Sequence, residues 1–186
     1  MFQNKKQVAL TRLDKARKEN LVDVGVMPLV DAINKRPSFY TTSSCLGRIV
    51  ISESPENDRK QEYVWLGKWH RKVTVDEVKT AISKHTKNTL WFRMDPLILH
   101  ICCNTIDDSD QLLKCAKKAG LKRSGVVQIK PRIMVEIMGV DVVCAPVFRN
   151  VDDELIEKFI DVANTRFDKN MNKLELFKKE LELLDK

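Results

Sequence analysis

The chain has 186 residues, which is enough for one well-buried domain, and its 43% hydrophobic and 32% charged residues are typical of a soluble globular protein. No apolar run approaches the roughly 18 residues of a membrane span, and the N-terminus lacks the apolar core of a signal peptide. We therefore expect a cytoplasmic protein, and its net charge of +7 favours partners of opposite charge, nucleic acid first.

The predicted elements of the N-terminal half are two helices followed by three strands. Pro28 suits the first turn of the second helix, and Pro37 prevents that helix from continuing far past Asn34. We expect helices over residues 4–20 and 28–34, strands over residues 39–42, 46–52 and 63–69, and a polar loop over residues 52–62.

The next part of the chain is predicted to alternate between helices and strands. Thr74 and Glu77 form a capping box, and Gly120 suits the left-handed position after a helix. We expect helices over residues 74–85 and 107–119, strands over residues 90–94, 97–103, 124–130, 132–138 and 142–147, and a hairpin turn at residues 139–141.

The tail, residues 152–186, is predicted to be one long amphipathic helix, because apolar residues recur at three- and four-residue steps. The predicted apolar stripe comprises Leu155, Phe159, Val162, Phe167, Met171, Leu174, Phe177, Leu181 and Leu184. We expect it to pack along the domain's own sheet. A coiled-coil partner is the alternative, so the protein is expected to be a monomer or a homodimer. The element order predicts an α+β fold: a single domain over residues 1–186, with a mixed, largely antiparallel sheet packed by helices.

The five cysteines predict thiols, not a metal site. No two of them form a CxxC pair, so we expect no zinc site and mostly buried, reduced side chains. They are Cys45, Cys102, Cys103, Cys115 and Cys144.

The segment TTSSCLGR, Thr41–Arg48, places four adjacent hydroxyls before a thiol, a glycine and an arginine. Buried hydroxyls need hydrogen-bond partners, so the run suits a surface that binds a polar ligand. Arg48 adds a planar charged fork for a carboxylate or phosphate. A serine-rich turn, with Gly47 supplying an unusual φ, explains the same residues equally well.

Two of the three histidines lie in informative surroundings. His70 follows Lys68 and Trp69 and precedes Arg71 and Lys72, a mixture that suits stacking on a base while holding its phosphates. The alternative is a strand end with solvated lysines, and we expect the earlier Trp65 to belong to the core. His100 lies within LILHICC, on the same strand face as Ile98 and Cys102, where a titratable group needs a partner.

Several common sequence motifs of enzymes and nucleotide-binding proteins are absent from the chain. No GxGxxG, Walker loop, HExxH or GxSxG occurs. A hydrolase using Ser44 or Cys45 with His70 or His100 stays a minority interpretation. The turn Lys122–Gly125 offers cations, a hydroxyl and backbone N–H groups to an anion, or is a solvated basic turn.

Four blocks in one order carry a family resemblance: YTTSSCLGR at 40–48, VWLGKWH at 64–70, PLILHI at 96–101 and GLKRSGV at 120–126. The chain resembles the tRNA wybutosine-synthesizing protein 3 family over nearly its whole length. The resemblance implies an S-adenosylmethionine-dependent methyltransferase with a non-Rossmann fold. The implied substrate is tRNA-Phe, methylated at ring nitrogen N-4 of a tricyclic guanosine that already bears an aminocarboxypropyl chain at position 37.

The resemblance also implies the site. His70 or His100 would accept a proton or hold the base edge, and Cys45 would pack within the motif. Lys122–Arg123 departs from the arginine–asparagine pair that relatives often carry, which weakens Arg123 as a ligand more than Ser124. The implied cofactor- or substrate-binding residues are Ser43, Ser44, Cys45, Gly47, Arg48, Arg123, Ser124 and Gly125, and the expected RNA-binding residues are Lys68, Trp69, Arg71 and Lys72.

A non-catalytic RNA-binding module for tRNA is the principal alternative. It explains the basic patches and leaves the hydroxyl cluster without a role.

Overall fold

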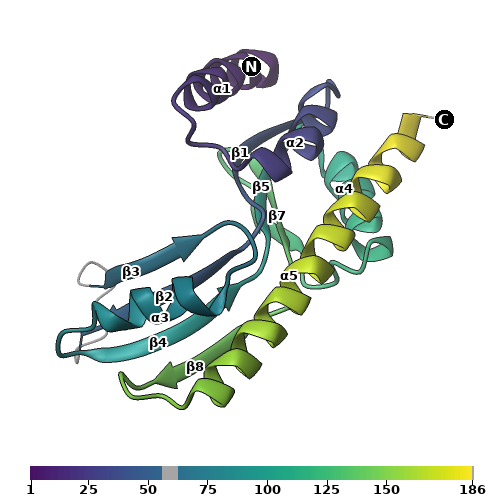
Figure 1. Cartoon of the computed structure of the whole chain (residues 1–186). Coiled ribbons are helices and arrows are strands. Elements are labelled where there is room, and N and C mark those ends of the chain that lie inside the picture. The colour runs from purple at the N-terminus through teal and green to yellow at the C-terminus, as the bar shows by residue number, and fades with distance from the viewer. Residues whose placement is uncertain (56–62, 186) are drawn as a thin grey trace. The chain divides into compact units, whose positions relative to one another are not determined.

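The structure is a computed structural model that describes residues 1–55 and 63–185. Most of the predicted polar loop, residues 56–62, therefore lies outside the described residues. The chain folds into two compact units (Figure 1). Unit 1 comprises Met1–Leu46, Leu97–Val140 and Asn170–Lys186, and unit 2 comprises Gly47–Pro96 and Asp141–Lys169. The expected single domain over residues 1–186 stays a prediction.

Unit 1 contains a four-stranded antiparallel sheet in the order β1-β5-β7-β6. Its strands are β1 (Phe39–Cys45), β5 (Ile98–Cys103), β6 (Gly125–Gln128) and β7 (Ile133–Met138). Its helices are α1 (Phe2–Lys18), the 3-10 turn η1 (Val24–Val26), α2 (Met27–Asn34), α4 (Ile106–Lys118), the C-terminal part of α5 (Asp153–Glu182) and the 3-10 turn η3 (Leu183–Asp185).

One face of this sheet forms the core of unit 1. Leu99, Ile101, Val135 and Ile137 are fully buried on it, as expected for alternate residues of strands with one covered face. On the other face His100, Met134, Glu136 and Met138 are only partly covered, whereas Cys102 is buried. We call this second side the open face.

The helix α1 lies beside the edge strand β1 (Figure 1). Its side-chain contacts with the rest of unit 1 lie mainly near its two ends. The rings of Phe2 and Tyr40 lie 5.1 Å apart, and the Lys6 ammonium donates to the Arg36 carbonyl. The other end is held by an ion pair between Arg17 and Asp31. Lys6 is the one residue of α1 that is buried, so the middle of the helix contributes no apolar side chain to the core.

Unit 2 contains a second antiparallel sheet, in the order β3-β2-β4-β8. The strands are β2 (Arg48–Ser54), β3 (Val64–Trp69), β4 (Thr89–Asp95) and β8 (Val143–Val147), accompanied by α3 (Val75–Ser83) and the N-terminal part of α5. Thr74 and Glu77 form the predicted capping box of α3. Phe92 of β4 stacks on Phe159 of α5, with ring centroids 5.9 Å apart.

The α+β class, the order of the predicted helices and strands, and the long C-terminal helix are confirmed. The strands form two antiparallel sheets where one sheet was expected, and neither is a parallel Rossmann sheet. The predicted hairpin turn at residues 139–141 is wrong, because β7 pairs with β5 and β6 whereas β8 pairs with β4. Among the described residues, no helix is both long enough and apolar enough to cross a membrane.

The helix α5 is buried along a stripe that only partly follows the prediction. Phe167, Leu174 and Phe177 are buried as expected. Leu155 and Val162, however, are 45% and 47% exposed. The buried positions in that half are Ile156, Ile160 and Ala163, one residue along from the predicted stripe.

Candidate active site

A β-bulge in β1 decides which hydroxyl reaches His100. Thr41 lies opposite Ile101 and Ser43 lies opposite His100, so Thr42 is the extra residue. If β1 paired regularly, Thr42 would lie opposite His100, and Ser43 would point to the same face as Thr41 because side chains alternate along a strand. Bulges commonly re-aim side chains in this way beside functional sites. The bulge therefore turns Ser43 onto the open face.

Ser43, His100 and Glu136 form a hydrogen-bonded chain across three neighbouring strands. Ser43 Oγ lies 2.7 Å from His100 Nδ1, and His100 Nε2 lies 3.0 Å from Glu136 Oε2. The three residues occupy one row of the sheet, since His100 pairs with Ser43 on one side and with Glu136 on the other. The side chains of His100 and Glu136 are each 28% exposed, so solvent and a ligand can reach the row.

The partners of His100 determine how its ring can exchange protons. A carboxylate only accepts hydrogen bonds, so Nε2 carries a hydrogen that it donates to Glu136. In the neutral ring Nδ1 then accepts from the Ser43 hydroxyl. Both ring nitrogens are thus occupied, and a ligand would reach the imidazole as a base through the Ser43 oxygen.

A cavity of about 870 Å³ lies in unit 1 between α1 and β1, and Ser43 is part of its wall. We call it the α1 cavity. Its volume falls within the range of small-molecule sites, which is roughly 300–1,000 Å³. The strand side presents Thr41, Thr42, Ser43 and Ser44. Because β1 is the edge strand of its sheet, residues from both of its faces reach the cavity.

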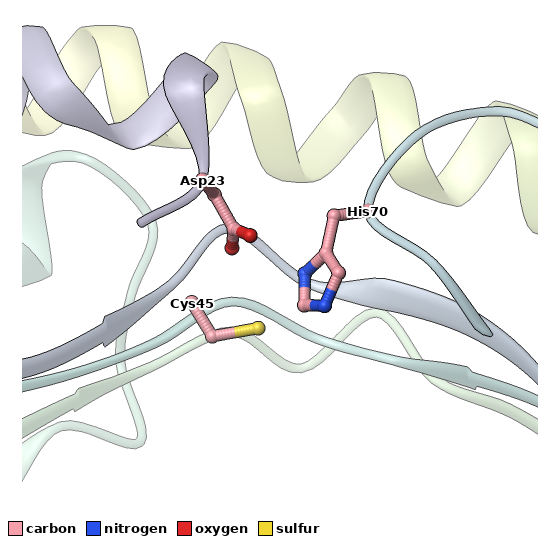
Figure 2. A group of neighbouring side chains, drawn as sticks. All are labelled: Asp23, Cys45 and His70. Carbon is pink, nitrogen blue, oxygen red and sulfur yellow. The ribbon is translucent and has the colours of Figure 1, made fainter. Parts of the chain in front are cut away.

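Cys45 ends β1 beside Asp23, a residue that the sequence analysis did not single out. Figure 2 shows the thiol of Cys45 and the carboxylate of Asp23 pointing toward each other. Their ligand atoms lie within 4.8 Å, and Asp23 Oδ2 accepts a hydrogen bond from the Leu46 N–H at 3.2 Å. The carboxylate therefore holds the end of the TTSSCLGR strand. His70, also drawn in Figure 2, follows β3 and belongs to unit 2.

The rest of that segment, Gly47 and Arg48, begins unit 2. Gly47 has a φ of 102°, the left-handed conformation that the sequence suggested. Arg48 Nε donates to Asp95 at 2.9 Å, and its guanidinium lies 5.0 Å from the centre of the Trp65 ring. Arg93 shares the same carboxylate, so the trio keeps one net positive charge. Trp65 is 47% exposed, and its expected place in the core is wrong.

The four predicted RNA-binding residues at 68–72 differ in whether their charge is already paired within the protein. Arg71 forms two hydrogen bonds with the carboxylate of Glu77, which holds the pKa of that carboxyl down at about 2, and Lys72 pairs with Asp168 at 3.1 Å. Lys68 forms no ion pair with any described residue and is exposed. The Trp69 ring lies over Gly67, where an added Cβ would be 2.2 Å away. Of the four residues, Lys68 is the one whose charge stays available.

The fourth block of the resemblance has a visible structural role. Ser124 Oγ donates to the Leu121 carbonyl at 2.8 Å and accepts from the Met138 N–H at 3.2 Å. Arg123 is exposed, and Gly125 lies opposite Glu136, with no heavy atom of the described residues within 4 Å of an added Cβ. The hydroxyl thus ties the start of β6 to the end of β7, and Gly125 leaves space beside Glu136.

The comparisons with known proteins agree over almost the entire chain. A family profile described as Methyltransferase TYW3 matches residues 4–183. The chain belongs to the TYW3 methyltransferase family.

Curated relatives of this TYW3 chain carry one name. A protein of Thermococcus kodakarensis is 37% identical over 98% of this chain and 95% of its own length, and one of Methanocaldococcus jannaschii is 34% identical over 89% of each. Both are named tRNA(Phe) 7-((3-amino-3-carboxypropyl)-4-demethylwyosine(37)-N(4))-methyltransferase, the former with the suffix 1.

Solved structures confirm the fold of the TYW3 chain. The PH1069 protein from Pyrococcus horikoshii is 33% identical, with a TM-score of 0.93 over 97% of this chain and 95% of that one. A hypothetical protein from Aeropyrum pernix is 28% identical, with a TM-score of 0.76 over 87% of this chain and 98% of that one.

Proposed function

We propose that this TYW3 chain transfers a methyl group from S-adenosylmethionine to N-4 of the 7-aminocarboxypropyl-demethylwyosine base at position 37 of tRNA-Phe. The observation that carries the proposal is the name shared by relatives that match almost all of the chain. The reaction would take place in the cytoplasm, with the anticodon loop of the tRNA as the contacted region.

The residues of the α1 cavity fit the proposed cofactor. Its strand side carries hydroxyls that can bond the hydroxyls of a ribose, and its helix side carries Val8, Ala9 and Leu13, which suit a planar ring. Ser43 and Ser44 are therefore the proposed cofactor- or substrate-binding residues of unit 1. Arg48, with its shared carboxylate, is proposed for a polar group of either ligand.

The cofactor supplies a methyl carbon on a positively charged sulfur, already activated for attack by nitrogen. In the proposed reaction N-4 would form the new C–N bond as the C–S bond breaks, and the electron pair of the C–S bond would stay on sulfur. The protein has two tasks in such a displacement, which are to orient the partners and to remove the proton from N-4.

The chain Ser43–His100–Glu136 is suited to removing that proton. Ser43 would take the proton from N-4 while its own hydroxyl proton passes to His100 Nδ1, at 2.7 Å. The resulting imidazolium lies 3.0 Å from the Glu136 carboxylate, which stabilises its charge. His100 is our proposed proton acceptor, and His70 stays a proposed catalytic residue of unit 2.

The decisive experiment supplies labelled S-adenosylmethionine and tRNA-Phe that lacks this final methyl group, followed by mass analysis of the nucleosides. The expected result is a gain of one methyl on the base at position 37, lost with the His100→Ala variant. Absence of any methyl gain with folded wild-type protein contradicts the proposal.

A non-catalytic RNA-binding module is the second candidate, favoured by the net charge of +7. Titration calorimetry with S-adenosylmethionine separates the two. No heat, and no rise in the thermal unfolding temperature on adding the cofactor, would favour the module.

A further inference from the structure

The helix α1 presents an apolar and cationic face that the described residues leave partly exposed. Positions 5, 8, 9, 12, 13 and 16 recur at three- and four-residue steps, so they form one helix face. All six residues line the α1 cavity, and none is fully buried. An amphipathic helix normally buries such a face against its own domain, so a ligand is expected to cover it.

The charged side chains that line the α1 cavity are all positive. Lys5, Arg12 and Arg132 line it, and no aspartate or glutamate stands among the described residues of its wall. Arg12 forms no hydrogen bond or ion pair with any described residue. Arg132 lies beside Tyr40, whose pKa burial raises to about 12 while the guanidinium acts in the opposite direction. Two guanidinium groups that pair with no described carboxylate suit an anionic group of the ligand.

The walls also set the length and polarity of the ligand. Apolar side chains of α1 face the hydroxyls of β1 across the cavity, and the cations stand among them. A carboxylate on a short aliphatic stem satisfies both, since the guanidinium fork matches a carboxylate and the stem covers the apolar side chains.

From these observations we infer that the α1 cavity holds the 3-amino-3-carboxypropyl group of a ligand, with its carboxylate bound by Arg12 and Arg132. The inference rests on the proposed function, in which two molecules carry this group. One is the base named for the relatives, and the other is S-adenosylmethionine, whose methionine part ends in the same α-amino acid head. Arg12 and Arg132 are then specificity residues that distinguish ligands with the head from ligands without it.

The test uses Arg12→Gln and Arg132→Gln, each alone and together, with Arg12→Lys as a variant that keeps the charge but loses the fork. Lys15→Gln is the matched control, because Lys15 lies on the same helix, does not line the cavity and pairs with Glu19. Arg12 and Arg132 are exposed, so all variants should unfold at the wild-type temperature.

The first arm measures cofactor binding by calorimetry. S-adenosylmethionine is compared with 5′-methylthioadenosine, which has the same nucleoside and sulfur but lacks the amino acid head. If the head belongs to the cofactor, each glutamine variant weakens S-adenosylmethionine binding about tenfold and leaves methylthioadenosine binding unchanged. Lys15→Gln should bind both like the wild type.

The second arm measures methylation of tRNA whose base either carries or lacks the aminocarboxypropyl chain. If the head belongs to the base, the glutamine variants raise KM about tenfold for the tRNA with the chain only. The inference is overturned if the variants behave like the wild type in both arms. It is also overturned if the variants raise KM equally for both tRNAs and this difference from the wild type disappears at high salt. That result would identify RNA phosphates as the partner of the two arginines.

Failure of the proposed function gives a different result. In that case the wild-type protein transfers no methyl group to either tRNA, whereas failure of this inference leaves the wild-type rate intact.

Discussion

Replacing Glu136 by glutamine tests the proposed proton acceptor most directly. Glutamine keeps the size and one oxygen acceptor of the side chain but removes the negative charge beside His100 Nε2. The charge matters only when the ring becomes an imidazolium, which in our mechanism happens as the methyl group is transferred. We therefore expect the rate of the chemical step to fall while ligand binding is preserved.

The size of this loss follows from the geometry. For unit charges 3.0 Å apart, Coulomb's law gives about 5.5 kcal/mol at an effective dielectric constant of about 20 and about 1.4 kcal/mol in water. Both side chains are 28% exposed, which favours the lower part of this range. We expect a loss of about 2 kcal/mol, or about 30-fold in rate.

The assay is single-turnover methylation with saturating cofactor and tRNA. Glu180→Gln is the matched control, because Glu180 is another half-buried carboxylate of unit 1, 25% exposed and paired with Lys118 at 3.3 Å. It should react at the wild-type rate. Imidazole ¹⁵N chemical shifts should report the Nε2–H tautomer of His100 in the wild type and a weaker preference in Glu136→Gln. A Glu136→Gln rate within threefold of wild type, in folded protein, would refute the proton-acceptor reasoning.

Three further predictions concern stability and titration. Gly67→Ala should lower the free energy of unfolding in urea by about 1–3 kcal/mol, because the new Cβ would lie 2.2 Å from the Trp69 ring; a Gly67→Ala protein as stable as the wild type would contradict the close approach. Thr105→Ala should cost about 1 kcal/mol, because the threonine caps α4 through the Asp108 N–H; an unchanged midpoint in urea would show that the cap contributes nothing. In a Tyr63→Phe protein, Tyr40 is the remaining tyrosine, and its phenolate absorbance should rise with a midpoint near pH 12. Because the folded state holds this proton more tightly than the unfolded state, the free energy of unfolding should fall as the pH rises from about 10 to 12. A midpoint near pH 10 would exclude the effect of burial.

Local chemistry made the helices and their ends predictable. The capping box at Thr74–Glu77 is formed, and Gly120 has the expected left-handed φ of 82°. The alternation in LILHICC placed His100 on the strand face opposite Leu99 and Ile101, and both of these residues are buried. These features depend on neighbours within a few residues, so a sequence contains them directly.

Features that depend on distant partners were not predictable. The sequence of residues 139–141 favours a hairpin turn, but the two flanking strands, β7 and β8, belong to different sheets. Trp65 was expected in the core, yet it is 47% exposed and its ring centre lies 5.0 Å from the guanidinium of Arg48.

The candidate site was predicted in part. Ser43 and His100 were both named, and the structure brings them together at 2.7 Å. Glu136 was missed, although the alternation in residues 132–138 was a signal that it faces away from Val135 and Ile137. Asp23 was missed for a different reason, because it lies 22 residues from Cys45 in a segment without a motif.

The bulge at Thr42 has a consequence for how this segment tolerates mutation. The four successive hydroxyl residues have similar side chains but different surroundings. Thr41 forms hydrogen bonds with Asn34, and Thr42 is the extra residue of the bulge. Ser43 lies opposite His100, and Ser44 lies opposite Leu99. A scan of all single substitutions should therefore give sharply different profiles at adjacent positions. Deleting Thr42 would keep Ser43 opposite His100, whereas an insertion between Thr42 and Ser43 would shift it. In an alignment, a gap in this run would carry more information than a change of residue.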